Sequence, residues 1–585
     1  MKKTIALIML SISLGFGQNY KLTNLKSTEV ECDLLIVCKS FFEQKANEHA
    51  QYRINNTLDE VTKPGIAILE DIYTTFPDST SQEGKLKQFL LYTAEQWKGE
   101  PRFVLLVGEP PAYGENETPY SCPSYFVPEN SYTDTDYVPI DDWLLKSERN
   151  QPCFAALGRL PVRTEIEYSS ILQKTKQFES NLDFTSVHTL SIYDDDMIAS
   201  ECNVLDFYEP SFSIESKKSS IVPNTWIQMI EYDADAEYRK RFLEDTIAHY
   251  INWGTSIVSY FGMGGENIWS DEAVLQTDSI IEKISDARAA IFLSFTSNSN
   301  RFQERDNSIG SKLLLAPNKG AVVAIGAPNL GQYASSLEQL QTNFWNIFTD
   351  HKTIGGVFYS AKAKVANSSI ERMNLLGDPS LMISVDSIGF AMPDTITANP
   401  GSQIQIKGTI PAANGILRVY RYSLPIKFER TTECGTEVSH YRSPFIIDTT
   451  DIQINSGTFT QNLIVNFDID SVVPVKLMYY ATIEGKKYYG AKFVIEGEPS
   501  ILASSRMPGN QVLKQYEIKM GTNGCTLRNI GFDGTIQIFQ ANGRLTHSYQ
   551  VQNRQDLLLM NLQSGLILIR TISKDGVSVR KLNQM

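Results

Sequence analysis

Two short apolar segments of the chain end in small and polar residues. Ser256–Phe261 runs into the glycine-rich loop Gly262–Gly265, and Ala289–Phe295 is followed closely by Ser297. The Ser297 hydroxyl could act as a nucleophile only if an adjacent base accepted its proton. The nearest candidate base after the glycine-rich loop is Glu266. A serine activated by a carboxylate is an unusual arrangement, so this pattern alone does not establish catalysis.

Met263 lies at the centre of the glycine-rich loop, between Gly262 and Gly264. Its thioether carries no titratable proton and is a weak hydrogen-bond acceptor, so Met263 cannot serve as a general acid or base. The loop also lacks the lysine and the GxxxxGK[ST] spacing of a phosphate-binding loop. The sequence therefore does not favour phosphate binding at this loop.

The polar residues that follow Ser297 begin with Asn298 and continue to Arg301. Amide, hydroxyl and guanidinium groups donate and accept hydrogen bonds, so this loop could bind a peptide or a glycan. The alternative is that it only keeps the shape of the strand end. Both interpretations stay open.

Asp134 and Asp136, together with Asp194–Asp196, are candidates for a structural calcium site. Hard cations take clusters of oxygen ligands, and carboxylates supply them. The alternative is that these are solvated loop acids of an acidic protein. No cofactor is required by the sequence.

The elements that must position these residues alternate between strand and helix. Asp33–Cys38 and Phe103–Glu109 are apolar runs typical of buried strands, and Gln82–Trp97 carries its apolar residues on one helical face. The alternation continues through predicted helices at Glu165–Glu179 and Ala236–Trp253. This pattern predicts an α/β fold with a parallel sheet, helices on both faces and a crevice at the carboxyl ends of the strands.

An ordered series of motifs in this region resembles the gingipain-type cysteine peptidases, which have a caspase-like fold. The motifs are Leu34–Val37, Leu105–Gly108, Gly158–Arg163 and Leu375–Ser380. The resemblance predicts a peptidase domain over residues 28–388, built from two α/β halves at about 28–180 and 186–388.

The same resemblance gives the two strand ends a specific meaning. In the family, the glycine-rich loop holds Gly-His-Gly with the catalytic histidine, and the second strand ends in the nucleophilic cysteine. In this chain Met263 stands at the histidine position and Ser297 at the cysteine position. The resemblance therefore implies the scaffold of a peptidase without its usual dyad.

The remainder of the chain predicts β structure. Residues 394–500 show short alternating strands separated by turns, which is typical of an immunoglobulin-like β-sandwich. Residues 510–585 resemble the C-terminal sorting domain of the type IX secretion system, with Ile567 where a tyrosine usually follows Gly565. The secretion machinery is thus an expected partner.

Residues 1–18 combine Lys2 and Lys3 with an apolar run from Ile5 to Phe16, the pattern of a secretory signal peptide. No later run approaches the ~18 apolar residues of a transmembrane helix. A net charge of −14 argues against a nucleic-acid partner and gives no polybasic membrane patch. We expect a secreted protein, or one on the outer-membrane cell surface after signal-peptide cleavage.

These observations favour a secreted, gingipain-like pseudopeptidase that binds a protein or peptide. One alternative is an active endopeptidase that uses Ser297 with an acidic partner. A second alternative is a glycan-binding surface protein.

Overall fold

The computed structural model describes most of the chain, in segments separated by gaps of different lengths. The described residues are 19–56, 60–130, 135–148, 151–180, 189–194, 224–228, 236–270, 274–329, 334–365, 368–383, 386–393, 395–398, 403–411, 414–422, 426–431, 437–442, 446–464, 475–483, 486–496, 517–521, 524–530, 534–540, 545–552, 555–560, 565–573 and 576–584. The chain divides into unit 1, Met1–Ser384 with Phe428–Tyr441, and unit 2, Val385–Lys427 with Arg442–Met585. The predicted signal peptide lies outside the described residues.

Unit 1 is built on a ten-stranded sheet in the order β2-β1-β3-β6-β14-β13-β12-β9-β7-β8. Its strands are β1 (Leu34–Cys38), β2 (Pro64–Ile68), β3 (Phe103–Val107), β6 (Ala156–Leu160), β7 (Thr189–Tyr193), β8 (Asn224–Gln228), β9 (Ile257–Phe261), β12 (Ala289–Phe295), β13 (Gly320–Gly326) and β14 (Asn374–Gly377). Two small hairpins are β4 (Phe126–Asn130) with β5 (Thr135–Pro139), and β10 (Ile268–Trp269) with β11 (Leu275–Gln276). The two predicted halves thus share one sheet.

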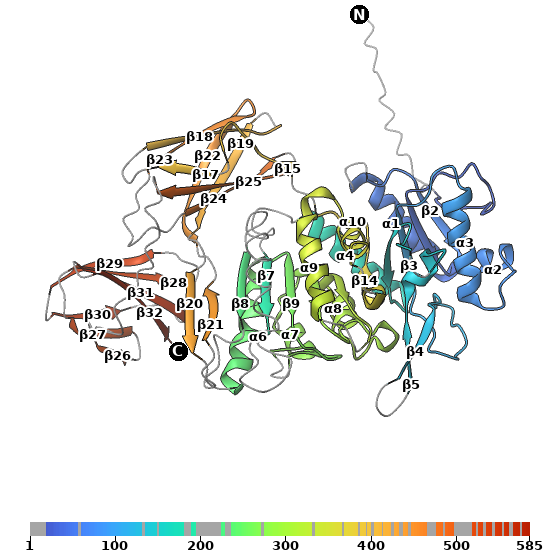
Figure 1. Ribbon diagram of the computed structural model, residues 1–585, viewed down its shortest axis with the longest axis horizontal. Helices are drawn as coiled ribbons and strands as arrows, with labels where there is room; N and C mark the ends of the chain where they lie inside the picture. The colour runs from blue at the N-terminus through green and yellow to red at the C-terminus, as the bar shows by residue number, and fades with distance from the viewer. Residues whose placement is uncertain are drawn as a thin grey trace, which may run out of the picture. The chain divides into compact units, whose positions relative to one another are not determined.

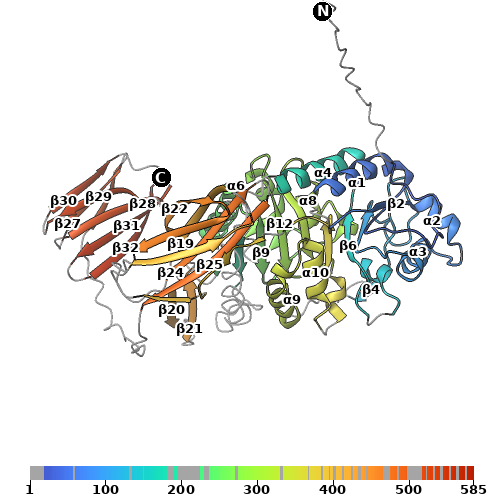
Figure 2. The same ribbon diagram turned by 90° about the horizontal axis from the view of Figure 1, so that it is seen from above.

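The helices of unit 1 cover both faces of this sheet, as Figures 1 and 2 show. They are α1 (Glu43–Asn56), α2 (Leu69–Thr75), α3 (Gln82–Gln96), α4 (Glu165–Ser180), α6 (Ala236–Trp253), α7 (Thr277–Lys283), α8 (Ile309–Leu315), α9 (Ala334–Asn346) and α10 (Ile354–Lys362), with short 3-10 helices at Ser40–Phe42, Asp141–Leu145, Phe302–Glu304, Phe348–Asp350 and Ser368–Arg372. One apolar cluster lies under α1, α4, α6, α7 and α8, and two others lie under α2 with α3 and under α9 with α10. The strand–helix alternation predicted from the sequence is confirmed.

The expectation of a parallel sheet is correct only within two groups of strands. β1, β2, β3, β6 and β14 run parallel to one another, and so do β7, β8, β9, β12 and β13. The groups meet at the antiparallel pair β13–β14, with Ile325 opposite Leu375. β14 is the last strand of the second half in the sequence, but it runs parallel to the strands of the first group. The strand direction therefore reverses between β13 and β14. The carboxyl ends of the two groups therefore lie at opposite edges of the sheet.

Unit 2 is described only as β structure. A nine-stranded sheet contains β15 (Asp386–Ser387), β16 (Gly389–Phe390), β17 (Thr395–Ala398), β18 (Gln403–Thr409), β19 (Asn414–Tyr422), β22 (Ile446–Asn455), β23 (Thr458–Ile464), β24 (Val475–Ile483) and β25 (Lys486–Glu496). Further sheets are formed by β26 (Glu517–Gly521), β27 (Gly524–Ile530) and β30 (Gln555–Met560), and by β28 (Gly534–Gln540), β29 (Leu545–Val551), β31 (Gly565–Ser573) and β32 (Gly576–Gln584). The separate pair β20 (Ile426–Thr431) and β21 (Glu437–Arg442) spans the segment assigned mostly to unit 1. The immunoglobulin-like and sorting-domain assignments stay predictions.

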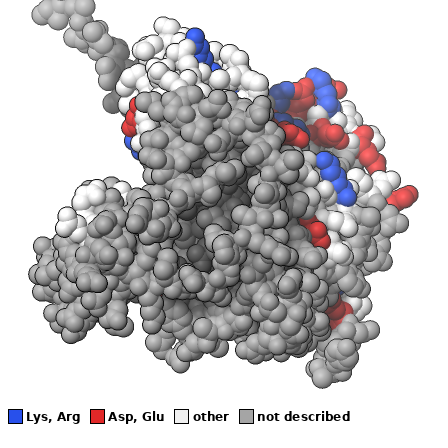
Figure 3. Space-filling model, turned by 60° about the vertical axis from the view of Figure 1, so that its left-hand side comes forward, with Lys and Arg blue, Asp and Glu red and all other residues white. Residues whose placement is uncertain are grey.

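Two properties of the described residues concern the surface. None of the described helices combines the length and the hydropathy that a bilayer-spanning helix needs. At the upper right of the face shown in Figure 3, Lys and Arg side chains lie close to Asp and Glu side chains. The described charges in that area are thus of both signs.

Candidate functional site

The structure brings Met263 and Ser297 to equivalent places at one edge of the sheet. β9 and β12 are neighbouring parallel strands, and Phe261 of β9 is paired with Phe295 of β12. Met263 lies two residues beyond Phe261, and Ser297 lies two residues beyond Phe295. The carboxyl ends of such strands are the usual place for a ligand site in α/β proteins. Met263 and Ser297 therefore both lie at the end of the sheet where the sequence predicts the crevice.

The order in which strands are added to the sheet reverses at this place. After β7 the chain adds β8 on one side of β7 and then β9 on its other side. Such a topological switch point leaves a crevice between the loops that follow the two strands. The loops that follow β7 and β9 begin with Asp194 and Gly262.

Asp194 fixes the glycine-rich loop. Its Oδ2 accepts hydrogen bonds from the Met263 backbone N–H (2.8 Å) and the Tyr260 hydroxyl (2.7 Å), and its own N–H donates to Phe261 O (3.0 Å). The Asp194 side chain is buried. A β-carbon on Gly262 would come within 2.2 Å of the Asp194 β-carbon, so only glycine fits there. Asp194 therefore holds the backbone on which Met263 sits.

The calcium hypothesis gains no support from this arrangement. Asp194 directs its carboxylate to Tyr260 and the Met263 backbone rather than to a cluster of acids. Asp134 and the two acids after Asp194 lie outside the described residues, and Asp136 is in β5, opposite Glu129. Among the residues that the structure describes, no three His, Cys, Asp or Glu side chains gather as metal ligands would. A calcium site stays a prediction, and no chemical step below depends on it.

Met263 is half-buried, and its side chain packs against the apolar cluster that contains Phe261 and Phe295. The Ser270 N–H donates to Met263 O (2.9 Å), so both backbone groups of Met263 are hydrogen-bonded. Gly264 lies beside Thr296, because a β-carbon on Gly264 would be 2.6 Å from Thr296 Oγ1. The loops after β9 and β12 are therefore in contact, with a thioether where an imidazole would be needed for acid–base chemistry.

Ser297 is half-buried, and the residue after it has an uncommon backbone conformation. Asn298 has φ +56°, a left-handed value that asparagine tolerates better than most residues. The Asn298 N–H donates to Asn329 O (3.0 Å), and the Asn300 N–H donates to Ala327 O (2.9 Å). The loop that carries Ser297 is thus held along the segment that follows β13.

No described residue supplies a base to Ser297. Among the hydrogen bonds and ion pairs of the described part of the chain, none joins the Ser297 hydroxyl to a titratable side chain. Glu266, the candidate from the sequence, has its Oε1 3.3 Å from Arg301 Nε. Among the described residues, the Glu266 carboxylate is thus paired with Arg301 and not hydrogen-bonded to Ser297.

Two polar atoms beside Ser297 are buried without a hydrogen-bond partner among the described residues. They are Thr296 Oγ1 and Asn298 Oδ1. Leaving such an atom unsatisfied costs about 1–3 kcal/mol, and native structures contain few of them. Together with the left-handed φ values of Asn298 and of Ser270 (+58°), this is the kind of local strain that collects at functional sites.

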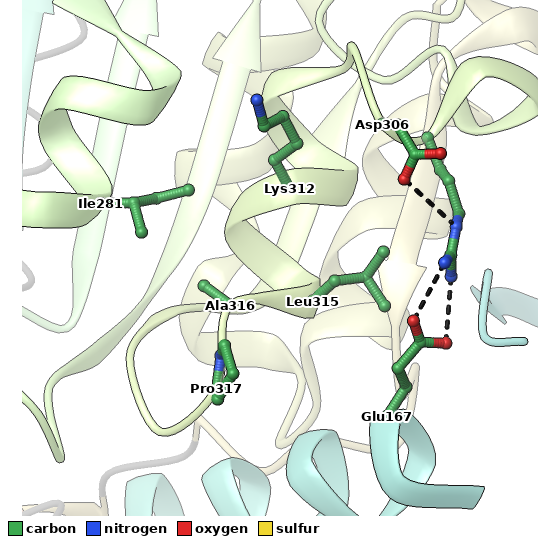
Figure 4. A pocket seen from close by; sticks show the side chains of 8 residues that line it. Glu167, Ile281, Asp306, Lys312, Leu315, Ala316 and Pro317 are labelled. Atoms are coloured by element: carbon green, nitrogen blue, oxygen red, sulfur yellow. Dashed lines mark hydrogen bonds and ion pairs between the residues drawn. The ribbon is translucent and has the colours of Figure 1, made fainter. Parts of the chain in front are cut away.

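A separate surface pocket lies beside α4, α7 and α8 (Figure 4). Ile281, Leu315 and Pro317 form its apolar wall. At its rim, Arg305 donates to both carboxylate oxygens of Glu167 (3.0 and 2.9 Å). This pair ties the segment after the Ser297 loop to α4. The pocket contains none of the predicted site residues.

Several residues of the site were missed or misread in the sequence. Asp194 was grouped with possible calcium ligands, although an acid placed directly after a buried strand could have been assigned to the same crevice as Gly262. Ser270 approaches Met263 through the β10–β11 hairpin, whose two-residue strands are too short to produce a recognisable pattern in the sequence. Asn329 follows β13, another apolar strand, so its place at the crevice edge could have been found by the same rule.

Comparisons with known proteins add the following findings. Residues 27–384 match the model of peptidase family C25. A crystal structure of the Arg-specific cysteine proteinase gingipain R is 14% identical, with a TM-score of 0.47, and the alignment covers 80% of this chain and 100% of that chain. A second structure, described as a protease, is 12% identical with a TM-score of 0.47, covering 79% of this chain and 97% of that chain. No curated protein matches the chain.

Proposed function

The chain belongs to peptidase family C25, and from this premise we propose that it is a pseudopeptidase that binds a protein or peptide at the crevice of Met263 and Ser297. The observation that supports the proposal is the pairing of β9 with β12, which brings the loop of Met263 beside the loop of Ser297. By the family resemblance, Met263 is the position at which the dyad partner of Ser297 would stand. A thioether neither accepts the hydroxyl proton nor protonates a leaving amine.

Two further observations support binding rather than turnover. The side chain of Met263 packs on the apolar cluster, so this position stabilises the fold. The two loops are also closely packed, because Gly262 fits against Asp194 and Gly264 against Thr296. A firmly held pair of loops in which no described base is hydrogen-bonded to Ser297 is suited to holding a peptide without cleaving it.

The proposal predicts no Ser297-dependent hydrolysis of a broad fluorogenic peptide library by the wild-type protein. We expect Met263→His/Ser297→Cys to gain measurable hydrolysis, because a histidine can activate a neighbouring thiol. Met263→Leu/Ser297→Cys is the matched control, which has the thiol but no base and should stay inactive. Wild-type turnover that Ser297→Ala abolishes would contradict the proposal and favour the endopeptidase alternative.

Binding is measured separately, with the wild-type protein on a peptide array and on a glycan array. The proposal expects peptides to be retained, and Asn298→Ala to weaken their retention. Retention of glycans alone would favour the glycan-binding alternative.

We also propose that the protein is exported, with residues 1–18 as signal peptide and residues 510–585 as a type IX sorting domain that delivers it to the outer-membrane surface or the medium. The charged and apolar pattern at the N-terminus and the resemblance of the C-terminal segment support this route. A chain that lacks residues 510–585 is expected to accumulate in the periplasm of the native host, which cell fractionation and immunoblotting measure. Surface delivery of the truncated chain would refute the sorting role.

A further inference from the structure

A carboxylate from the β4–β5 hairpin reaches the loop that carries Ser297. Glu129 Oε1 accepts hydrogen bonds from Asn329 Nδ2 (2.8 Å) and from Arg372 Nη1 (2.7 Å). The backbone oxygen of the same Asn329 accepts from the Asn298 N–H (3.0 Å). Two hydrogen bonds therefore connect Glu129 of the first half to the residue after Ser297 in the second half.

Backbone pairing and hydrogen bonds at its open end hold the β4–β5 hairpin in place. All five residues of β4 pair with β5, and Glu129 lies opposite Asp136. At the foot of the hairpin, the Ile140 N–H donates to Tyr125 O (2.7 Å), and Pro123 O accepts from Arg159, a buried residue of β6. Glu129 is thus presented by an element that is anchored in the sheet of unit 1.

The loop at the other end needs such support. A left-handed backbone is disfavoured for most residues with a side chain, though less so for asparagine, and it persists where the surroundings support it. Asn298 has this conformation directly after Ser297. Since Asn329 is held from one side by Glu129, its backbone oxygen has a fixed place at which to receive the Asn298 N–H.

We propose that Glu129 is a positioning residue of the crevice, which fixes the Ser297–Asn298 loop through Asn329. The crevice is then built from both halves of unit 1, although all the strands that end at it belong to the second group. This inference rests on the proposed function only in that it takes this loop to be the part that contacts a ligand. The side-chain oxygen of Glu129 is the part that acts here, because it accepts the hydrogen bond from Asn329 Nδ2.

The test measures how accessible the loop is to a thiol-specific reagent, and it requires neither catalytic turnover nor a known ligand. In the full-length chain with Ser297→Cys, iodoacetamide alkylates the introduced thiol at a rate that depends on how the loop is held. Trypsin releases this thiol in the peptide Ala289–Arg301, which contains none of the seven native cysteines, so mass spectrometry measures its alkylation alone. We expect Glu129→Ala to raise the rate about fivefold, as loss of a local anchor favours opening of the loop.

Three comparisons separate positioning from general destabilisation. Glu129→Gln keeps an oxygen acceptor and is expected to stay within about twofold of the Ser297→Cys parent. Asn329→Ala should raise the rate as Glu129→Ala does, and the double variant should add nothing further, because both changes break one link. Glu43 of α1 forms an ion pair with Lys21 that is about as exposed as the pair of Glu129 with Arg372. Glu43→Ala removes that pair and should leave the alkylation rate unchanged.

Either of two results would overturn the inference. One is an unchanged alkylation rate in Glu129→Ala, and the other is additive effects of Glu129→Ala and Asn329→Ala. If Glu129→Ala fails to fold, Asn329→Ala and Glu129→Gln still decide, because an unchanged rate in Asn329→Ala contradicts the link by itself. A failure here leaves the peptidase assays untouched, so it can be distinguished from a failure of the proposed function.

Discussion

Replacing Asp378 with alanine is expected to lower the free energy of unfolding of unit 1 by about 3–5 kcal/mol, the usual cost of breaking a buried ion pair. Asp378 is buried, and its Oδ2 accepts from Arg53 Nε (2.5 Å) and His49 Nε2 (2.6 Å). Its Oδ1 accepts from the backbone N–H (2.8 Å) and the hydroxyl (2.7 Å) of Ser380. The alanine would leave the Arg53 guanidinium charged, buried and partly uncompensated.

The measurement is urea unfolding followed by tryptophan fluorescence. All six tryptophans lie between Trp97 and Trp345, so the signal reports unit 1 and not unit 2. Asp245→Ala is the matched control, because Asp245 pairs with Lys283 on an exposed surface. We expect that control to change stability by less than about 1 kcal/mol. Equal losses in the two variants would show that the Asp378 network contributes no more than a surface pair.

The same carboxylate makes the acid stability of unit 1 depend on pH. Burial alone would raise the pKa of Asp378, but Arg53, His49 and the hydrogen bonds hold that pKa well below its ordinary range. The unfolded chain takes up a proton near pH ~4 while the folded protein does not. The contribution of Asp378 is therefore present above pH ~4 and is lost as the pH falls from there toward the folded-state pKa. Asp378→Asn should accordingly lose less stability on acidification than the wild type does.

The fold of unit 1 could be predicted because most of its strands are largely apolar and its helices carry one apolar face. Ala289–Phe295 is buried along nearly its whole length, as a strand inside a doubly covered sheet must be. The placement of Met263 and Ser297 at the same end of the sheet followed from the same property, because the strands that precede them are parallel neighbours. An apolar run indicates that a segment is buried, and its length and residue pattern indicate a strand. This information is enough to predict where the strand ends.

What could not be predicted depends on contacts between distant parts of the chain. The reversal at β13–β14 is set by where Asn374–Gly377 inserts, and its apolar pattern is the same in either direction. Glu129 and Asn329 meet only because a hairpin crosses to the other half, and no periodicity reports such a crossing. Asp378 lies in a motif that the sequence singled out, but its partners in α1 cannot be inferred from the motif.

Replacing Arg159 with methionine is the second large effect that we expect, again a loss of about 3–5 kcal/mol in the stability of unit 1. Arg159 is buried and uses all five of its N–H donors. Three bonds go to the carbonyl oxygens of Gly108 (2.8 Å), Cys122 (2.9 Å) and Pro123 (3.0 Å), and two go to the carboxylate of Asp141 (2.6 and 2.8 Å). The guanidinium therefore joins β6 to three loop segments that include the foot of the β4–β5 hairpin.

The reason for this loss can be separated from simple loss of volume. In Arg159→Met/Asp141→Leu no buried charge is left without a partner, so we expect part of the stability to return, while the three carbonyl oxygens still lack a donor. Arg102→Met is the control, because Arg102 pairs with Glu60 and is half exposed, and a change within about 1 kcal/mol is expected there. Urea unfolding with the same fluorescence signal measures all three variants. A double variant no more stable than Arg159→Met would show that the carbonyl contacts, and not the Asp141 charge, make Arg159 necessary.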